Sequence, residues 1–423
     1  MLNRLKRLLP VLLCLAAPTF VRAQLSFYTN SGSITITGYN PAGGPNLIIP
    51  STTNGFPVTV IGQNAFQFLN LTNVLIPNSI TMISNYAFYG CQRLTNVMLP
   101  ASLAGVGRIM FNYCTNLQDI SVNNANPAFS SAGGVLFNKA QTTLLQCPNG
   151  LQGSYVVPGT VTSLSWGAFS GTRLSNVSLP ASVTNMENYV FDYCASLTNF
   201  SAAAANPSFM STNGVLFTKD QTTLMAFPGA IAGVYVVPNT VTNIAGAAFD
   251  YSVLSQVILP NSLKNISLLA FGSCPNLASI IIPASVTNVM VGAFDSSYTL
   301  ARVYFLGHAP ATDWGDQRNT PIFSSATTVF YLPGTTNWGD KYGTAPTVLW
   351  NPQMTNLNFG KGEFSSDITM PSNSIIVIEA CTNLAQPAWM PLVTNVYSGT
   401  SQISFSDPQS AIYPQRFYRL RTP

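Results

Sequence analysis

Apolar residues recur along this chain in a fixed order. A leucine and two polar residues precede a short alternating apolar run that ends in proline, and a second apolar group and a phenylalanine follow. The order begins again at Leu71, Leu94, Leu174, Leu254 and Leu277. Its commonest spacing is about 23 residues, which is typical of a solenoid of stacked coils. Because so short a unit cannot bury its own apolar face, each coil is expected to pack on its neighbours.

The positions within one coil predict a strand and a buried ring. Leu71, Val74 and Ile76 follow the spacing L-x-x-L-x-L, and alternation directs their side chains inward. Pro77 ends the strand because proline cannot donate a ladder hydrogen bond. The phenylalanines that follow are expected to stack as a buried aromatic spine, which comprises Phe66, Phe88, Phe111, Phe169, Phe191, Phe249, Phe271 and Phe294.

A longer duplication lies over the coil pattern. Residues 101–180 match residues 181–260 without a gap, and each copy carries an insert in which GVLF and YVVP predict strands. Caps are expected at the ends of the array, because an uncapped coil would expose its core. We predict a signal peptide at residues 1–23, an amino-terminal cap at 24–56, the repeat array at 57–299, carboxy-terminal capping coils at 300–350 and a small β-sandwich-like module at 351–423.

The repeated motif L-x-x-V-x-[IL]-P-x-S-[VL]-x-x-[IM]-x-x-x-A-F-x-x-C resembles the BspA-like leucine-rich repeat family of bacterial surface and secreted proteins. The resemblance covers residues 33–350 and includes the GVLF and YVVP insert. It implies a parallel β-solenoid, export, and often adhesion or protein binding. We therefore predict a mainly β fold, a leucine-rich-repeat solenoid of about 23-residue coils with a parallel sheet, followed by a small all-β module.

The start of the chain predicts export. A basic beginning, an apolar run from Leu8 to Ala17 and small residues before Gln24 are typical of a secretory signal that is cleaved after Ala23. This run is too short to cross a bilayer, and no later segment reaches the ~18–20 apolar residues of a membrane helix. The sequence therefore predicts a secreted or cell-surface protein without a transmembrane span.

Charge argues against nucleic acid as a partner. Of the 17 basic residues, four lie in the signal segment, so that 13 remain beside 13 acidic residues. Binding to phosphates needs clustered Lys and Arg, which a nearly neutral mature chain lacks. We therefore expect no nucleic-acid partner.

The cysteines predict packing positions. Export would permit disulfides, but a column of cysteines at one coil position is expected to pack as small buried groups. No Cys or His pair has the short spacing of a zinc site, so neither a metal nor a cofactor is expected. The column consists of Cys91, Cys114, Cys194 and Cys274.

Catalytic groups are sparse. The one histidine, His308, has Asp313 and Asp316 nearby, which permits an acid–base, metal or Ca²⁺ interpretation, but the spacing of a known calcium loop is absent. Glu187 and Asp192 form the nearest close pair of carboxylates, and both are expected on solvated turns. We expect no enzymatic activity.

The outward positions of the stacked strands form the remaining candidate site. Apolar residues occupy both ends of this row, with Ser and Asn between them. Such a row marks a contact surface or arises from strand packing alone, and both interpretations stay open. The candidate ligand-binding residues are Leu75, Met98, Asn176, Ile258, Ile281 and Tyr304.

These observations favour a secreted or cell-surface interaction protein, such as an adhesin, that binds a macromolecular partner through the solenoid surface. Two alternatives remain, a carbohydrate-binding protein for polysaccharide capture and a structural envelope component. A protein partner predicts an apolar patch, and a glycan predicts exposed aromatic rings. Self-association would fit the near-zero charge of the mature chain. The sequence does not identify the ligand, protein or polysaccharide.

Overall fold

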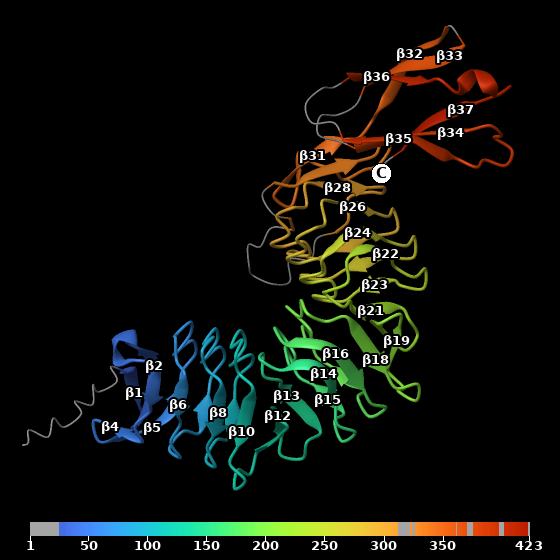
Figure 1. Cartoon of the computed structure of the whole chain (residues 1–423). Helices are drawn as coiled ribbons and strands as arrows, with labels where there is room; N and C mark the ends of the chain where they lie inside the picture. The colour runs from blue at the N-terminus through green and yellow to red at the C-terminus, as the bar shows by residue number, and fades with distance from the viewer. Residues whose placement is uncertain are drawn as a thin grey trace, which may run out of the picture.

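A computed structural model describes residues 25–311, 322–323, 326–360, 362–369, 375–396 and 402–421 of the 423-residue chain. The predicted signal peptide lies outside these ranges. Figure 1 shows coils stacked along a curved path, which begins in the blue amino-terminal arm and ends in the red carboxy-terminal module. Each regular coil has a leucine-repeat strand, a second short strand and a turn segment around the spine phenylalanine. The predicted fold class is therefore confirmed.

The leucine-repeat strands lie side by side on one side of the stack, which we call the strand face. They pair in parallel, so that Asn96 lies opposite Asp119 and Ser279 opposite Arg302. The strand face consists of β3 (Asn46–Ile48), β6 (Asn73–Leu75), β8 (Asn96–Leu99), β10 (Asp119–Val122), β14 (Gln152–Val156), β16 (Arg173–Leu179), β18 (Asn199–Ala202), β22 (Gly233–Val236), β24 (Leu254–Ile258), β26 (Ser279–Ile282), β28 (Arg302–Phe305), β29 (Thr328–Tyr331) and β31 (Ala345–Leu349).

A second row of shorter strands forms another side of the coils. It is parallel as well, with Met82 opposite Gly105 and Asn243 opposite Asn265. This row consists of β5 (Phe56–Ile61), β7 (Met82–Ile83), β9 (Gly105–Val106), β13 (Thr143–Gln146), β15 (Ser163–Leu164), β17 (Asn185–Met186), β21 (Thr223–Ala226), β23 (Asn243–Ile244), β25 (Asn265–Ile266) and β27 (Asn288–Val289).

The two inserts each add an antiparallel hairpin to this second row. β11 (Phe129–Ala132) pairs with β12 (Val135–Asn138), which pairs with β13. β19 (Phe209–Thr212) and β20 (Val215–Thr218) repeat the arrangement before β21. The GVLF and YVVP segments of the sequence thus both supply strands, as expected.

In each insert, one asparagine forms hydrogen bonds to the coil before it. The fully buried side-chain amide of Asn126 donates to the carbonyls of Pro100 and Leu103 at 2.8 and 2.9 Å. Its Oδ1 accepts the backbone N–H groups of Ala128 and Phe129, both at 2.8 Å. All the hydrogen-bonding capacity of a buried amide is thereby used.

The predicted spine forms. Its rings are buried and stack on their neighbours, with centroids 4.9 Å apart for Phe249 and Phe271 and 5.3 Å apart for Phe169 and Phe191. Phe227, from the second insert, joins the same stack 5.1 Å from Phe249.

The cysteine column packs beside the spine, as expected. Three residues after its own spine ring, Cys274 donates its thiol to the carbonyl of Phe249 at 3.2 Å, and Ser297 does the same to Phe271 at 2.7 Å in the next coil. The cysteines of the described ranges are buried and unpaired.

The amino-terminal cap begins with two longer strands. β1 (Leu25–Asn30) pairs antiparallel with β2 (Ser33–Tyr39), and β2 pairs in parallel with β5. The helix η1 (Pro41–Gly43) and the short β4 (Thr52–Thr53) complete the cap. Among the described residues, we find no helix with the length and apolarity that crossing a membrane requires.

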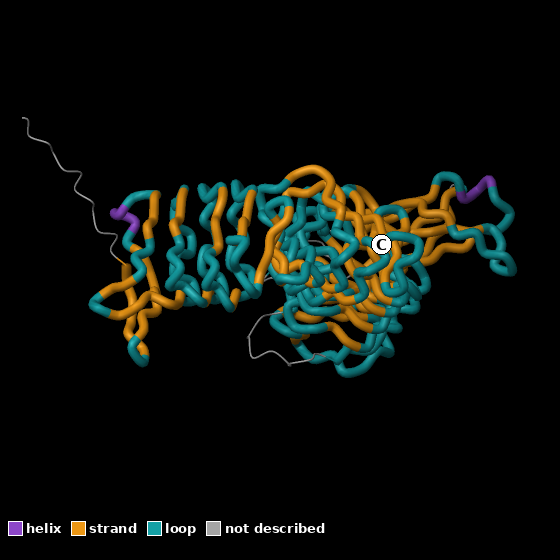
Figure 2. Tube along the Cα trace, turned by 90° about the horizontal axis from the view of Figure 1, so that it is seen from below, coloured by secondary structure: helices purple, strands orange, loops and turns teal. Residues whose placement is uncertain are grey.

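The carboxy-terminal module contains two three-stranded antiparallel sheets. One has the order β32 (Gln353–Gly360), β33 (Glu363–Thr369), β36 (Gln402–Asp407), and the other the order β35 (Met390–Val396), β34 (Ile375–Cys381), β37 (Phe417–Arg421). The short β30 (Lys341–Tyr342) and the helix η2 (Ser410–Ile412) precede and accompany them. In Figure 2 the two 3-10 helices, in purple, lie at opposite ends of the molecule. The domain boundaries given above remain predictions.

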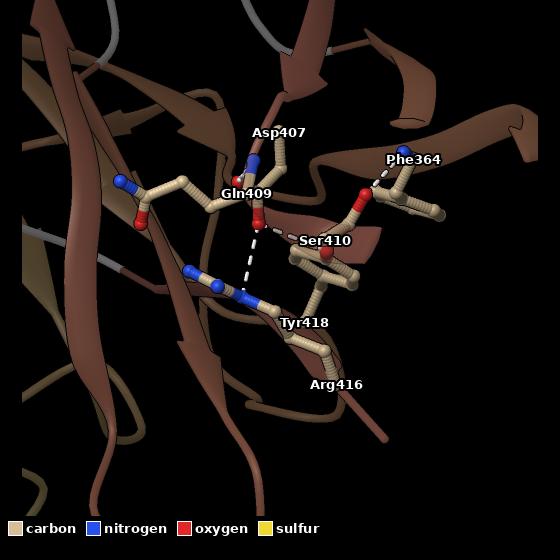
Figure 3. Close-up of polar contacts among 6 residues, drawn as sticks. All are labelled: Phe364, Asp407, Gln409, Ser410, Arg416 and Tyr418. Carbon is tan, nitrogen blue, oxygen red and sulfur yellow. Dashed lines mark hydrogen bonds and ion pairs between the residues drawn. The ribbon is translucent and has the colours of Figure 1, made fainter. Parts of the chain in front are cut away.

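The module contains a cluster of buried polar side chains that contact one another (Figure 3). Arg416 and Asp407 form an ion pair at 2.9 Å, and both side chains are almost completely buried. Asp407 also accepts the Tyr418 hydroxyl and the backbone N–H of Gln409, each at 3.0 Å. The backbone N–H of Phe364 donates to Ser410 at 2.7 Å. Three partners thus satisfy the buried Asp407 carboxylate, whereas Nη1 of Arg416 is buried without a hydrogen-bond partner among the described residues.

The stack curves toward the turn segments. Tyr113 and Tyr193 lie in turn segments, and their ring centroids are 5.2 Å apart. The strands that follow these two turn segments in the sequence are β10 and β18. On the strand face, β14 and β16 separate them. Because the turn side is shorter than the strand face, we place it on the inside of the curve visible in Figure 1.

Candidate functional site

The outward row of the strand face is apolar and exposed at its amino-terminal end. Leu75 and Met98 are exposed there, as predicted, and Ile48 lies opposite Leu75 on the neighbouring strand β3. Asn46 and Asn73, two positions earlier, hydrogen-bond to each other through their amides at 2.8 Å. The result is a short apolar row beside an amide ladder.

The carboxy-terminal end of the row differs from the prediction at Tyr304. We expected this ring to be exposed, but only 1% of it is. It stacks on Phe330 at 4.9 Å and belongs to a core cluster with Ile378 and Phe405 of the module. The alternation along β28 does point Tyr304 out of its own coil, but the carboxy-terminal module covers that position.

Ile258 and Ile281 lie where the strand face meets the module. Ile258 is exposed and Ile281 half-buried, and both line a groove of about 310 Å³ that Arg421 of β37 also lines. Asn176, in the middle of the face, is half-buried and accepts the amide of Asn199 at 2.8 Å. The six candidate residues therefore do not form one patch, and their role in binding remains a prediction.

A concave surface, separate from the strand face, lies among the turn segments. These segments place residues in the left-handed region two positions before and two after the spine ring, as at Tyr189 and Tyr193 around Phe191, with φ of 60° and 57°. Left-handed φ is unusual for bulky residues, so the stacked segments hold these tyrosines in a strained conformation.

The turn segments of distant coils enclose a cavity of about 320 Å³, which we call the tyrosine cleft. Its aromatic lining is half-buried and therefore reachable from solvent. Residues as far apart in sequence as Tyr86 and Asp295 line it, because the curve brings their coils together. The aromatic lining consists of Tyr86, Tyr89, Tyr113, Trp166, Tyr189 and Tyr193.

The rings of the cleft contact one another in a continuous series. Centroids are 5.0 Å apart for Tyr89 and Tyr113 and 4.5 Å apart for Trp166 and Tyr189. At the rim, the Arg108 guanidinium lies 4.9 Å from the Trp166 ring centre. Tilted and edge-on pairs of this kind fix ring positions before any ligand arrives.

Asp192 lines the cleft and hydrogen-bonds to the buried carboxyl group of Asp250, and here the expectation of a solvated turn was wrong. Glu187 is exposed, as expected, but Asp192 is half-buried and its Oδ1 is inaccessible to solvent. Burial raises the pKa of Asp192 and, more strongly, that of Asp250, whose pKa the charge of Asp192 raises further. The Asp250 carboxyl thus holds a proton and hydrogen-bonds to Asp192, while Tyr193 N–H donates to Asp250 Oδ2 at 3.1 Å.

The recurring tyrosines of the sequence indicate this cleft, although the coil spacing alone does not predict it. Tyrosine recurs within two residues of the spine ring, as in the segments NYAFYGC, MFNYC and NYVFDYC. A period of one coil shows that these tyrosines share a column. It does not show that insert-induced curvature brings several columns together.

The other candidates for chemistry are isolated. His308 is exposed and its Nδ1 lies 3.0 Å from the backbone nitrogen of Thr336, so it takes part in a loop contact. Asp313 and Asp316 lie outside the described residues. Within the described ranges, no group of His, Cys, Asp and Glu has the arrangement of a metal site.

Comparisons with known proteins agree with the repeat architecture. A model of the BspA type leucine rich repeat region (6 copies) matches residues 46–152, 151–232 and 225–310. One similar solved structure is a leucine-rich repeat protein from Eubacterium ventriosum ATCC 27560, with 17% identity, a TM-score of 0.42 and coverage of 74% of this chain and 77% of that chain. A leucine rich cell surface protein from Faecalibacterium prausnitzii A2-165 has 25% identity, a TM-score of 0.38 and coverage of 66% and 86%. The pneumococcal vaccine antigen PcpA has 16% identity, a TM-score of 0.38 and coverage of 77% and 96%.

No curated protein matches the chain. The family match nevertheless extends over more than half of the residues and coincides with the coils that carry the phenylalanine spine. The chain belongs to the BspA type leucine-rich repeat family.

Proposed function

We propose that this chain is an exported recognition protein that binds a protein partner on the strand face, around Ile48, Leu75 and Met98. The exposed row of these residues carries the proposal, since more than half of each side chain is accessible. Specific interfaces combine an apolar centre with a polar rim, and the amide ladder of Asn46 and Asn73 supplies such a rim.

Family membership supports export and surface display, because the BspA-like family comprises surface and secreted proteins. The role of an adhesin is the specific form of this proposal, with binding and no chemical step. The carboxy-terminal module covers the opposite end of the row at Tyr304, so the amino-terminal end is the part left open to a partner.

The test is binding of the chain without residues 1–23 to a panel of extracellular-matrix and cell-surface proteins by biolayer interferometry. The double change Leu75→Asp and Met98→Asp should weaken a positive interaction at least about tenfold, since charge at an interface centre is strongly unfavourable. The control is Ile412→Asp, which changes an exposed residue of the module. Unchanged affinity in the double variant would contradict the strand-face assignment, and no binding to any panel member would contradict the protein-binding function.

A further inference from the structure

We propose that the tyrosine cleft is a second recognition site, separate from the strand face, and that it binds a short stretch of a neutral sugar chain. Its volume of about 320 Å³ lies at the lower end of ligand pockets, about 300–1,000 Å³. That volume suits a short linear ligand better than a folded protein surface.

The aromatic lining supplies the flat surfaces that such a ligand needs. The apolar C–H faces of a sugar ring pack on aromatic rings, and the tyrosine hydroxyls offer both donors and acceptors. Tyr86, Tyr113 and Tyr193 are held with left-handed φ between neighbouring coils, so they are positioned in advance and lose little freedom on binding.

The polar groups of the cleft match hydroxyls. Asn112 and Ser170 are buried in the lining, and Asp192 and Asp295 lie beside them. Carboxylate oxygens accept hydrogen bonds from hydroxyl groups. Asp192 and Asp295 are both half-buried in the lining, so hydroxyl groups of a ligand in the cleft can reach their carboxyl groups.

The charge of the lining excludes acidic ligands. None of the residues that line the cleft is Lys, Arg or His, and two are aspartates. A phosphate, sulfate or uronate would meet like charge without a base in the lining, since Arg108 at the rim is paired with Glu187 at 3.9 Å. The ligand is therefore neutral or cationic.

The geometry of the rings favours the neutral ligand over the cationic one. A cationic ligand is held best by aromatic faces that converge on one point. The rings here follow one another edge-on or tilted along the coil stack, as in the contacts of Tyr113 with Tyr89 and Tyr193. This elongated arrangement fits successive sugar rings.

The experiment is titration of the chain lacking residues 1–23 with defined neutral oligosaccharides (gluco-, xylo-, manno- and galacto-oligosaccharides). Calorimetry and tryptophan fluorescence give the readouts. Uronate oligosaccharides and tetramethylammonium serve as the acidic and cationic probes. We expect binding of at least one neutral oligosaccharide and neither of the other probes.

Two alanine variants of the cleft, one conservative cleft variant and one control test the assignment. Trp166→Ala and Tyr89→Ala should each weaken binding about tenfold or more, and Trp166→Phe should abolish the fluorescence change while keeping most of the affinity. Leu75→Asp and Met98→Asp, which alter only the strand face, should leave sugar binding unchanged. This control separates the cleft from the protein-binding proposal.

Three outcomes would overturn the proposal. One is absence of binding to every neutral oligosaccharide by a chain with native circular dichroism. Another is sugar binding that survives in both folded alanine variants, which would place the sugar site elsewhere. The third is preferential binding of tetramethylammonium, which would make the cleft a site for cations.

Discussion

Single buried polar residues fix where the inserts attach, and the asparagine before proline in each insert is the clearest case. Asn206 repeats the bonds of Asn126, donating to the carbonyls of Pro180 and Val183 at 2.7 and 2.9 Å. It accepts the backbone N–H of Phe209 at 2.7 Å. An aspartate has the same shape but lacks the two N–H donors.

Asn206→Asp should therefore destabilise the fold by about 2–5 kcal/mol, because a buried carboxylate would face two carbonyl oxygens. Chemical denaturation followed by circular dichroism measures this change. The matched control is Asn239→Asp at an exposed turn position, for which we expect a change within about 0.5 kcal/mol. Equal stability of the two variants would show that the insert does not depend on this amide.

The carboxyl pair predicts how stability changes with pH. The folded state raises the pKa of Asp192 and Asp250 above the unfolded value near 3.8, and they face Asp295 and several tyrosines but no base in the cleft lining. A raised pKa means that the folded state binds the proton more tightly, so its contribution to stability is present in acid and lost as pH rises.

The melting temperature should therefore fall as pH rises from about 5 to about 9. Asp250→Asn keeps the shape and removes the charge, so it should flatten this fall and raise the melting temperature at pH 8. Asp119→Asn, a change on strand β10, should leave the slope unaltered. Thermal denaturation at several pH values decides, and an unchanged slope in Asp250→Asn would mean that the pair is ionised in the folded state.

At the scale of elements, the phenylalanine spine holds one coil to the next. Phe249 is fully buried and stacks on both Phe227 and Phe271, at 5.1 and 4.9 Å. Phe249→Ala should cost about 3–5 kcal/mol, through lost burial and the cavity left behind. The exposed Tyr298→Ala should change the free energy of unfolding by less than about 0.5 kcal/mol. Denaturant titration compares the two, and similar losses would contradict a stabilising role for the spine.

Local periodicity predicts which side chains each coil buries, because a side chain that points into its own coil is buried whatever the rest of the molecule does. Phe249 and Cys274 were assigned correctly on this basis, and so were the insert strands. The curve of the stack was not predicted, since it depends on how the inserts space the coils, which periodicity does not show. The break in the spine was not predicted either. In the first insert Cys147 occupies the position that Phe227 holds in the second, so the spine is not continuous there.

At the scale of the whole molecule, what covers an outward side chain depends on segments far away in the sequence. Alternation on β28 could place Tyr304 outside its coil but could not show that the module packs over it. The tyrosine cleft escaped prediction for the same reason, because turns from coils separated by both inserts must meet to form it. The repeat allows the local structure of each coil to be predicted from the sequence. Curvature and capping instead depend on the segments that do not follow the repeat, namely the inserts and the carboxy-terminal module.

The module should therefore act as a cover for the end of the strand face. Tyr304, Phe330 and Trp350 are buried in the cluster that the module completes with Ile368 and Ile378. A chain that ends at residue 351 would expose these rings on adjacent parallel strands and should self-associate, because contiguous exposed apolar surface drives association.

Size-exclusion chromatography with light scattering at increasing protein concentration measures this association. Changing both Tyr304 and Phe330 to Thr in the shortened chain places smaller β-branched residues, which favour strands, at these positions and should restore the monomer. The same double change in the full chain should instead lower stability, because it removes the two rings from a buried cluster. A shortened chain that stays monomeric without these changes would show that the module does not shield this surface, and its attachment would then serve another purpose.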